Sequence, residues 1–103
     1  MKKTVFFDKN AEKELEKLDH SVRAKITILI DLLERDGVLI EPYGKKVEWN
    51  LFEMRVRVSG QWRLIYAYVP MEHIVVLSIF QKKRQKTPQS ELQTAKKRLQ
   101  KYL

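Results

Sequence analysis

Residues 51–80 read LFEMRVRVSGQWRLIYAYVPMEHIVVLSIF, a stretch in which apolar segments are separated by two turn signals. At its start, apolar and charged side chains alternate residue by residue, which is typical of a strand with one buried face. The Ser59-Gly60 pair predicts the first turn, and Pro70-Met71-Glu72 predicts the second. The last segment is almost continuously apolar, which favours a central strand buried on both faces. The stretch therefore predicts a meander of three antiparallel strands at residues 51–58, 62–69 and 73–80.

The residues before this stretch predict a short strand and two helices. The first helix can be capped by Asp8 or Asn10, because a short side-chain oxygen accepts from the free N–H groups of a first helical turn. The second helix ends at Asp36-Gly37, since glycine readily takes the left-handed conformation that terminates helices. Pro42 and Gly44 then predict a loop over residues 38–44. The predicted elements are a strand at residues 3–7 and helices at residues 10–18 and 20–35.

A basic segment, QKKRQK at residues 81–86, leads into a last predicted helix over about residues 88–101. Thr87 can cap this helix, and Pro88 suits its first position, where no backbone N–H is needed. The elements then follow the order β-α-α-β-β-β-α. This order predicts an α+β fold in which one antiparallel sheet packs against helices. The length of 103 residues suits a single domain, residues 1–103.

The helix predicted at residues 20–35 carries more apolar side chains than one sheet face needs. Its core stripe has helical spacing and comprises Val22, Ile26, Leu29 and Leu33. Ile28, Ile30 and Leu32 widen this stripe. Two interpretations are open: the additional residues fill a tight core, or they form a surface that receives a partner protein.

Composition and charge exclude several classes of protein. The absence of cysteine excludes disulfides, thiolate zinc sites and cysteine nucleophiles. No run of 18 apolar residues is present, and the apolar stretch after Lys2-Lys3 is too short for a signal peptide, so the sequence predicts a cytoplasmic protein without a membrane span. Residues 1–50 carry 10 Lys or Arg and 10 Asp or Glu, whereas residues 51–103 carry 11 and 3, the whole net charge of +8. A basic half of this kind favours RNA or the ribosome over an acidic protein partner.

Three basic clusters are expected to meet on one side of the sheet. A hairpin at Ser59-Gly60 would bring Arg63 near Arg57, although the face on which Arg63 lies depends on the strand register. The alternative is an ordinary solvated surface in which Glu53 pairs with an arginine. The first cluster is Glu53, Arg55 and Arg57, the second is Arg63, and the third is Lys82, Lys83, Arg84 and Lys86.

These clusters lack the residues of most catalytic sites but suit RNA cleavage. The sequence contains no metal-ligand cluster, no nucleophile–His–acid arrangement and no phosphate-binding glycine loop, so we expect no metal and no cofactor. Cleavage requires the ribose 2′-hydroxyl to lose a proton, charge on the phosphorane to be stabilised and the 5′-oxygen to be protonated. Arginine suits the charge, and a lysine crowded by cations has a lowered pKa and can act as a base. Tyr66 or Tyr68 could transfer a proton, and Trp62 could stack a base or lie in the core.

Four motifs occur in a fixed order: LFEMR at residues 51–55, RLIY at 63–66, FQKK at 80–83 and QKTP at 85–88, with Ala95 downstream. Together they resemble the phage-derived HigB-like branch of the RelE/HigB toxin superfamily over essentially the whole chain. The resemblance implies a compact RelE-like fold and a toxin of a type II toxin–antitoxin pair. It also implies a metal-independent endoribonuclease that cuts mRNA on the ribosome. A cognate antitoxin, often a helix-turn-helix protein, would neutralise it, and operator DNA would be bound only through that antitoxin.

Candidate site residues follow from the resemblance together with the clusters. The catalytic candidates are Arg55, Arg63, Lys82, Lys83 and Tyr66, and the RNA-binding candidates are Arg57, Trp62, Arg84 and Lys86. Ser78 stands where many relatives carry a histidine, and if that histidine takes part in the chemistry, this chain is an attenuated enzyme. Two other functions remain open. One is a non-enzymatic RNA- or ribosome-binding module, and the other is a toxin of the same fold that acts on another target, such as gyrase.

Overall fold

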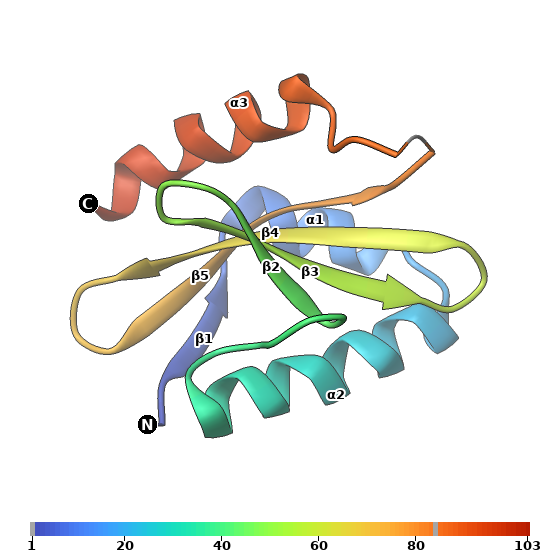
Figure 1. The fold of residues 1–103 in the computed structure, drawn as a ribbon, viewed down its shortest axis with the longest axis horizontal. Helices are drawn as coiled ribbons and strands as arrows, with labels where there is room; N and C mark the ends of the chain where they lie inside the picture. Colours follow the sequence, from blue (N-terminus) through green and yellow to red (C-terminus); the bar gives the residue numbers. More distant parts are fainter. Residues whose placement is uncertain (1, 84) are drawn as a thin grey trace.

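The computed structural model describes residues 2–83 and 85–103, which form one sheet with helices on both faces (Figure 1). The predicted α+β class is confirmed, and β2 is a strand that the sequence did not predict. None of the described helices is long and apolar enough to cross a membrane. The elements are β1 (Thr4–Phe7), α1 (Lys9–Glu16), α2 (His20–Asp36), β2 (Gly44–Glu48), β3 (Leu51–Arg57), β4 (Gln61–Val69), β5 (His73–Gln81), α3 (Gln89–Leu99) and a closing 3-10 turn, Gln100–Tyr102.

The five strands lie in the order β1-β5-β4-β3-β2. The predicted meander is confirmed, because β3, β4 and β5 are antiparallel neighbours. The sheet is nevertheless mixed, since β1 pairs with β5 in parallel. Strand β5 therefore has a neighbour on each side, and its residues from Ile74 to Phe80 are buried, as the continuous apolar run predicted.

Two apolar layers enclose the sheet. Helices α1 and α2 cover one face and α3 covers the other (Figure 1). Of the residues that widen the stripe on α2, Ile30 and Leu32 pack against the first core cluster, whereas Ile28 is 54% exposed. The core interpretation therefore holds for Ile30 and Leu32, and Ile28 is left on the surface.

The predicted cap of α1 and the predicted end of α2 are confirmed, but the predicted cap of α3 is wrong. Asp8 caps α1 by accepting from the backbone N–H of Asn10 at 3.0 Å. Gly37 ends α2 with a φ of 78°. Thr87, however, does not cap α3: Pro88 occupies the N-cap position, and the hydroxyl of Thr87 donates to the carboxylate of Glu53 instead. As an N-cap, this hydroxyl would accept from a backbone N–H, whereas here it donates to a buried carboxylate, and a charged partner makes that hydrogen bond stronger than a neutral one.

Candidate functional site

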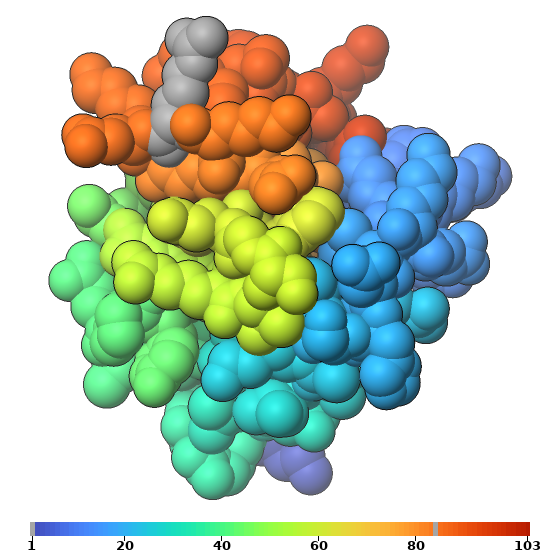
Figure 2. Space-filling model, turned by 90° about the vertical axis from the view of Figure 1, so that its right-hand side faces the viewer, coloured from blue at the N-terminus to red at the C-terminus, as the bar shows by residue number. Residues whose placement is uncertain are grey.

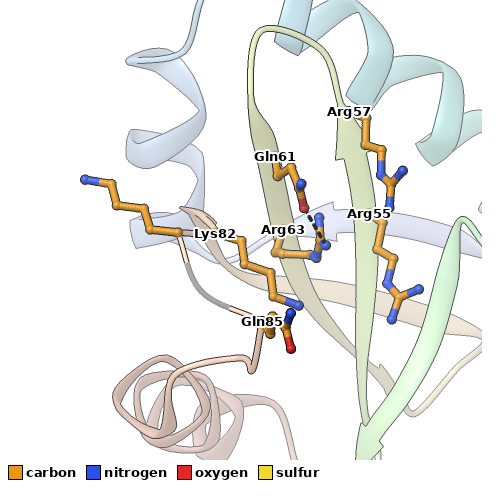
Figure 3. A pocket seen from close by; sticks show the side chains of 7 residues that line it. Arg55, Arg57, Gln61, Arg63, Lys82 and Gln85 are labelled. Atoms are coloured by element: carbon orange, nitrogen blue, oxygen red, sulfur yellow. Dashed lines mark hydrogen bonds between the residues drawn. The ribbon is translucent and has the colours of Figure 1, made fainter.

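A cationic pocket of about 490 Å³ lies beside the turn between β3 and β4 (Figure 3). The strand register assembles it, because Arg55 of β3 lies directly opposite Arg63 of β4, and Phe80 at the end of β5 lies opposite Arg63 in turn. The direct neighbour of Arg63 is thus Arg55 and not Arg57, which pairs with Gln61. The pocket is lined by Arg55, Arg57, Gln61, Arg63, Lys82, Lys83 and Gln85, so members of all three predicted clusters meet there.

A buried carboxylate holds the arginines of this pocket in place. Glu53 is only 1% exposed, and its Oε1 lies 3.2 Å from Nε of Arg63 and 3.3 Å from Nε of Arg55. Its other oxygen accepts from the hydroxyl of Thr87. An arginine as buried as Arg63, at 3% exposed, would be costly without such a partner. Glu53 therefore joins β3, β4 and the segment before α3 beneath the pocket.

Two further contacts fix the guanidinium of Arg63. Its Nη1 donates to the carbonyl oxygen of Trp62 at 3.0 Å, and its Nη2 donates to Oε1 of Gln61 at 3.3 Å (Figure 3). Burial lowers the pKa of Arg63, and Arg55 adds to this effect whereas Glu53 opposes it. Arginine remains protonated even so, because its ordinary pKa is far above neutral. The pocket thus contains a positive charge of fixed position.

The backbone of Lys82 is fixed by a hydrogen bond, and the pKa of its side-chain amine is lowered. Its backbone N–H donates to the carbonyl oxygen of Gln61 at 2.7 Å, which ties the end of β5 to the start of β4. Burial lowers the pKa of its side chain, Glu53 opposes this effect, and Arg63 and Arg55 lower the pKa further. An amine with a lowered pKa exchanges protons more readily near neutral pH. Lys82 is therefore the pocket residue best suited to proton transfer.

Two predicted site residues lie on the wrong face of the sheet. Tyr66 is 1% exposed within the core beneath α1 and α2, and burial raises the pKa of its hydroxyl. Trp62, opposite Val56, packs against the same core. Successive strand residues point to opposite faces, so Trp62 and Tyr66 lie across the sheet from Arg63. Buried Tyr66 therefore cannot contact RNA in the cationic pocket, and half-buried Trp62, on the other face of the sheet, cannot stack on a base bound there.

The remaining candidates occupy three kinds of position. Lys83 is exposed and lines the pocket, whereas Lys86 is exposed but does not line it. Arg84 lies outside the described residues. Ser78 is 1% exposed, sits opposite Ile65 in the sheet and does not line the pocket. Among the described residues, no group of three or more His, Cys, Asp or Glu could hold a metal ion.

Some residues of the site were not predicted from the sequence. Gln61 and Gln85 line the pocket, and no property of their neighbourhood in the sequence distinguishes them from other surface glutamines. The pairing of Glu53 with an arginine was expected only as part of the alternative interpretation of a solvated surface, whereas the structure buries the pair.

Comparisons with known proteins agree with this fold. The family model described as phage-derived protein Gp49-like matches residues 13–100. A doubly substituted E. coli RelE toxin in the free state superposes with a TM-score of 0.74 at 22% identity, over 96% of this chain and 99% of that one. The RelE of the archaeal RelE–RelB complex from Pyrococcus horikoshii gives 0.61 at 24% identity, over 82% and 99% of the two chains. A chain of the intact E. coli RelBE toxin–antitoxin complex gives 0.61 at 27%, over 80% and 99%. A search of curated proteins finds no match.

Proposed function

The chain belongs to the Gp49-like family of phage-derived proteins and has the fold of RelE toxins, and from this premise we propose that it is the toxin of a type II toxin–antitoxin pair that cuts mRNA on the ribosome. The observation that carries the proposal is the cationic pocket, which five cationic side chains line and beneath which a buried carboxylate pairs with two of them. A pocket of this charge suits an RNA phosphate, because arginine and lysine bind phosphate oxygens directly.

The proposed chemistry divides the three tasks of RNA cleavage among the pocket residues. Arg63 and Arg55 bind the phosphate that is cut and stabilise the charge that develops on its oxygens. Lys82, with its lowered pKa, takes the proton of the ribose 2′-hydroxyl. The 2′-oxygen then bonds to phosphorus, the bond from phosphorus to the 5′-oxygen breaks, and Lys82 gives the proton to that oxygen. Lys83 and Arg57 bind neighbouring phosphates. Each of these steps uses side chains alone, so the proposal includes no metal or cofactor.

The proposed partner is a cognate antitoxin. The E. coli and archaeal RelE toxins have each been crystallised with RelB, which supports an antitoxin for this chain too. An acidic or amphipathic segment of that protein would cover the cationic pocket. We further propose that the antitoxin is a helix-turn-helix protein and that the pair binds operator DNA only through it.

A second candidate function is an RNA- or ribosome-binding module without nuclease activity. The observation in its favour is the composition of the pocket, whose described lining consists of arginine, lysine and glutamine without histidine, tyrosine or carboxylate. Such a lining can bind phosphates without transferring protons.

The deciding experiment adds the purified chain to translating ribosomes and maps the ends of the mRNA. We expect new ends within the decoded region. Replacing one charge-stabilising donor in an active site slows a reaction by about 10²–10³-fold, so Arg55→Gln and Lys82→Gln should cut at least about a hundredfold more slowly. Lys2→Gln is the matched control, because Lys2 is exposed and lies near the opposite end of the sheet. Intact mRNA in the presence of bound protein would favour the binding module. In cells that express the chain, arrested growth with DNA damage and intact mRNA would favour a gyrase-directed toxin.

A further inference from the structure

A second, smaller pocket of about 190 Å³ adjoins the cationic pocket. It is lined by Lys25 of α2, Pro42 and Tyr43 before β2, and Arg55 and Arg57 of β3. Both arginines also line the cationic pocket, so they form the wall that the two spaces share. A polymer such as RNA that binds in the cationic pocket can therefore extend over these two arginines into the second pocket.

The second pocket exists because β2 is shorter than the strand it pairs with. The pairing of β2 begins at Gly44, opposite Met54, so Arg55 and Arg57 lie beyond the partner strand. The last backbone link on this side is the bond from the N–H of Arg55 to the carbonyl oxygen of Tyr43, at 2.9 Å. Figure 2 shows this end of the molecule, where the yellow-green turn after β3 lies between the orange segment after β5 and the cyan helix α2.

Tyr43 presents an aromatic ring on a fixed turn. The backbone N–H groups of Tyr43 and Gly44 both donate to the carbonyl oxygen of Ile40, at 2.9 and 3.1 Å. Gly44 packs so tightly that a Cβ on it would lie 2.6 Å from Cβ of Leu39, which holds the turn against the chain before it. The side chain of Tyr43 nonetheless remains 45% exposed. A ring held in this way can stack on another ring with little loss of conformational freedom.

We propose that the second pocket binds the base of the nucleotide next to the phosphate held in the cationic pocket, with that base stacked on Tyr43. This subsite rests on the proposed RNA-directed function and adds a determinant of sequence preference to it. The volume of about 190 Å³ is below the roughly 300–1,000 Å³ of sites for drug-sized ligands, which suits a single ring system. Base–aromatic stacking is the usual means by which proteins bind unpaired bases.

The polar groups of the second pocket favour bases with carbonyl oxygens. Lys25, Arg55 and Arg57 can only donate hydrogen bonds, and Lys25 and Arg57 form no ion pair within the described part of the chain. At the 4-position of a pyrimidine or the 6-position of a purine, uracil and guanine present a carbonyl oxygen that accepts, whereas cytosine and adenine present an amino group that donates. The subsite should therefore prefer uracil to cytosine, two bases that differ at this position and have the same ring size.

The test measures binding of two fluorescently labelled 2′-O-methyl tetranucleotides, one of uridine and one of cytidine, which cannot be cut at the blocked 2′-oxygen. We expect the uridine probe to bind about tenfold more tightly than the cytidine probe. Tyr43→Leu should weaken uridine binding about tenfold, which corresponds to the typical value of one stacked base. Tyr43→Phe should remain within about twofold of the natural chain. Trp49→Leu is the matched control, since Trp49 is 78% exposed and lines neither pocket.

The same measurement separates the subsite from the cationic pocket. Lys82→Gln should weaken both probes equally, because it removes one positive charge from the pocket that holds their phosphates. Weaker binding by Lys82→Gln with unchanged binding by Tyr43→Leu would overturn the subsite and leave the cationic pocket in place. Equal affinity for the two probes would overturn the preference for carbonyl oxygens, and absence of binding to either probe would overturn the subsite together with the RNA-directed function. If the probes bind with the predicted affinities but the chain cuts no mRNA on ribosomes, the subsite is supported and only the nuclease activity is rejected.

Discussion

Glu53 neutralises the arginines beneath the cationic pocket. The structure places one carboxylate, 1% exposed, within 3.3 Å of both Arg55 and Arg63. Removing one partner of a buried ion pair leaves the other charge unpaired, which typically costs about 3–5 kcal/mol. We therefore expect Glu53→Gln to lower the free energy of unfolding by about that amount, as measured by urea denaturation.

A second Glu→Gln substitution, at an exposed ion pair, shows whether the loss of stability comes from burial of the pair or from removal of a negative charge alone. Glu72 also pairs with a cation, Lys3, but its side chain is 56% exposed. Exposed pairs contribute about 0–1 kcal/mol, so Glu72→Gln should have a small effect. Equal losses in the two variants would show that Glu53 is not the neutralising group that its position indicates.

At the residue scale, the sequence placed the cations of the site well and its aromatic residues badly. Arg55, Arg63 and Lys82 were predicted from the family resemblance together with the basic clusters, which short sequence motifs are enough to reveal. Tyr66 was assigned to the site although alternation alone separates it from Arg63, since the two are three residues apart on one strand and so point to opposite faces. The burial of Glu53 could not be predicted, because it depends on α3 covering that face of the sheet.

Arg98 of α3 joins three elements near Leu77, where the pairing of β5 with β4 shifts its register. Its Nη1 donates to the carbonyl oxygen of Leu77 at 2.7 Å, and its Nη2 lies 3.2 Å from the carboxylate of Glu14 on α1. Glu14 in turn accepts from the backbone N–H of Ile79 at 3.0 Å. Hydrogen bonds of charged groups contribute about 1.5–3 kcal/mol each, so Arg98→Ala should destabilise the fold by about 2–3 kcal/mol. Urea denaturation measures the loss, and hydrogen exchange should show faster exchange at Ile79.

Lys97 provides the control on the same helix. It is exposed and adjacent in sequence, so Lys97→Ala should change stability by less than about 0.5 kcal/mol. An Arg98→Ala variant as stable as Lys97→Ala, with unchanged exchange at Ile79, would mean that α1 and α3 are held by apolar packing alone.

At the element scale, long patterns were predicted and short ones were not. The alternation of β3 and the apolar run of β5 each extend over seven or more residues, which makes them unambiguous. Strand β2, Gly44–Glu48, has only five residues with two adjacent lysines, and it forms because β3 offers an edge with which to pair. The start of α3 was mispredicted for a similar reason, since Thr87 bonds to Glu53, 34 residues away.

At the scale of the whole molecule, the charge asymmetry of the sequence located the cationic pocket but not its surroundings. All of the net charge lies in residues 51–103, as do the cations that line this pocket. The second pocket, however, takes Lys25 and Tyr43 from the half without net charge. Sequence composition cannot reveal such a site, because it is formed where α2 and the loop before β2 meet β3.

The two ends of the chain meet at another buried carboxylate. Asp8 is fully buried and accepts from the hydroxyl of Tyr102 at 2.6 Å, and Lys101 lies 2.8 Å from the same oxygen. Burial by itself would raise the pKa of Asp8, but hydrogen bonds from Lys101, Tyr102 and the backbone of Asn10 outweigh it and hold the pKa below the ordinary value of 3.8. Burial, with Asp8 adding to it, raises the pKa of Tyr102 to about 12.

This lowered pKa predicts a defined dependence of stability on acid. A carboxyl group whose pKa is lower in the folded than in the unfolded chain stabilises the fold fully above its unfolded pKa, and the contribution is lost as pH falls through the folded pKa. At pH 6, Asp8→Asn should therefore cost about 1.5–3 kcal/mol, and the loss should shrink progressively below about pH 4. Asparagine caps helices as well as aspartate does, so α1 keeps its cap and the substitution isolates the charge. Urea denaturation of the natural chain and of Asp8→Asn at pH 6 and pH 3 measures the difference in their free energies of unfolding. The titration of the other carboxylates cancels in this difference, because both proteins contain them.

The exposed Asp31→Asn is the control and should change stability by less than about 0.5 kcal/mol at either pH. A loss for Asp8→Asn that is the same at both pH values would mean that Lys101 and Tyr102 do not stabilise the charged form of Asp8.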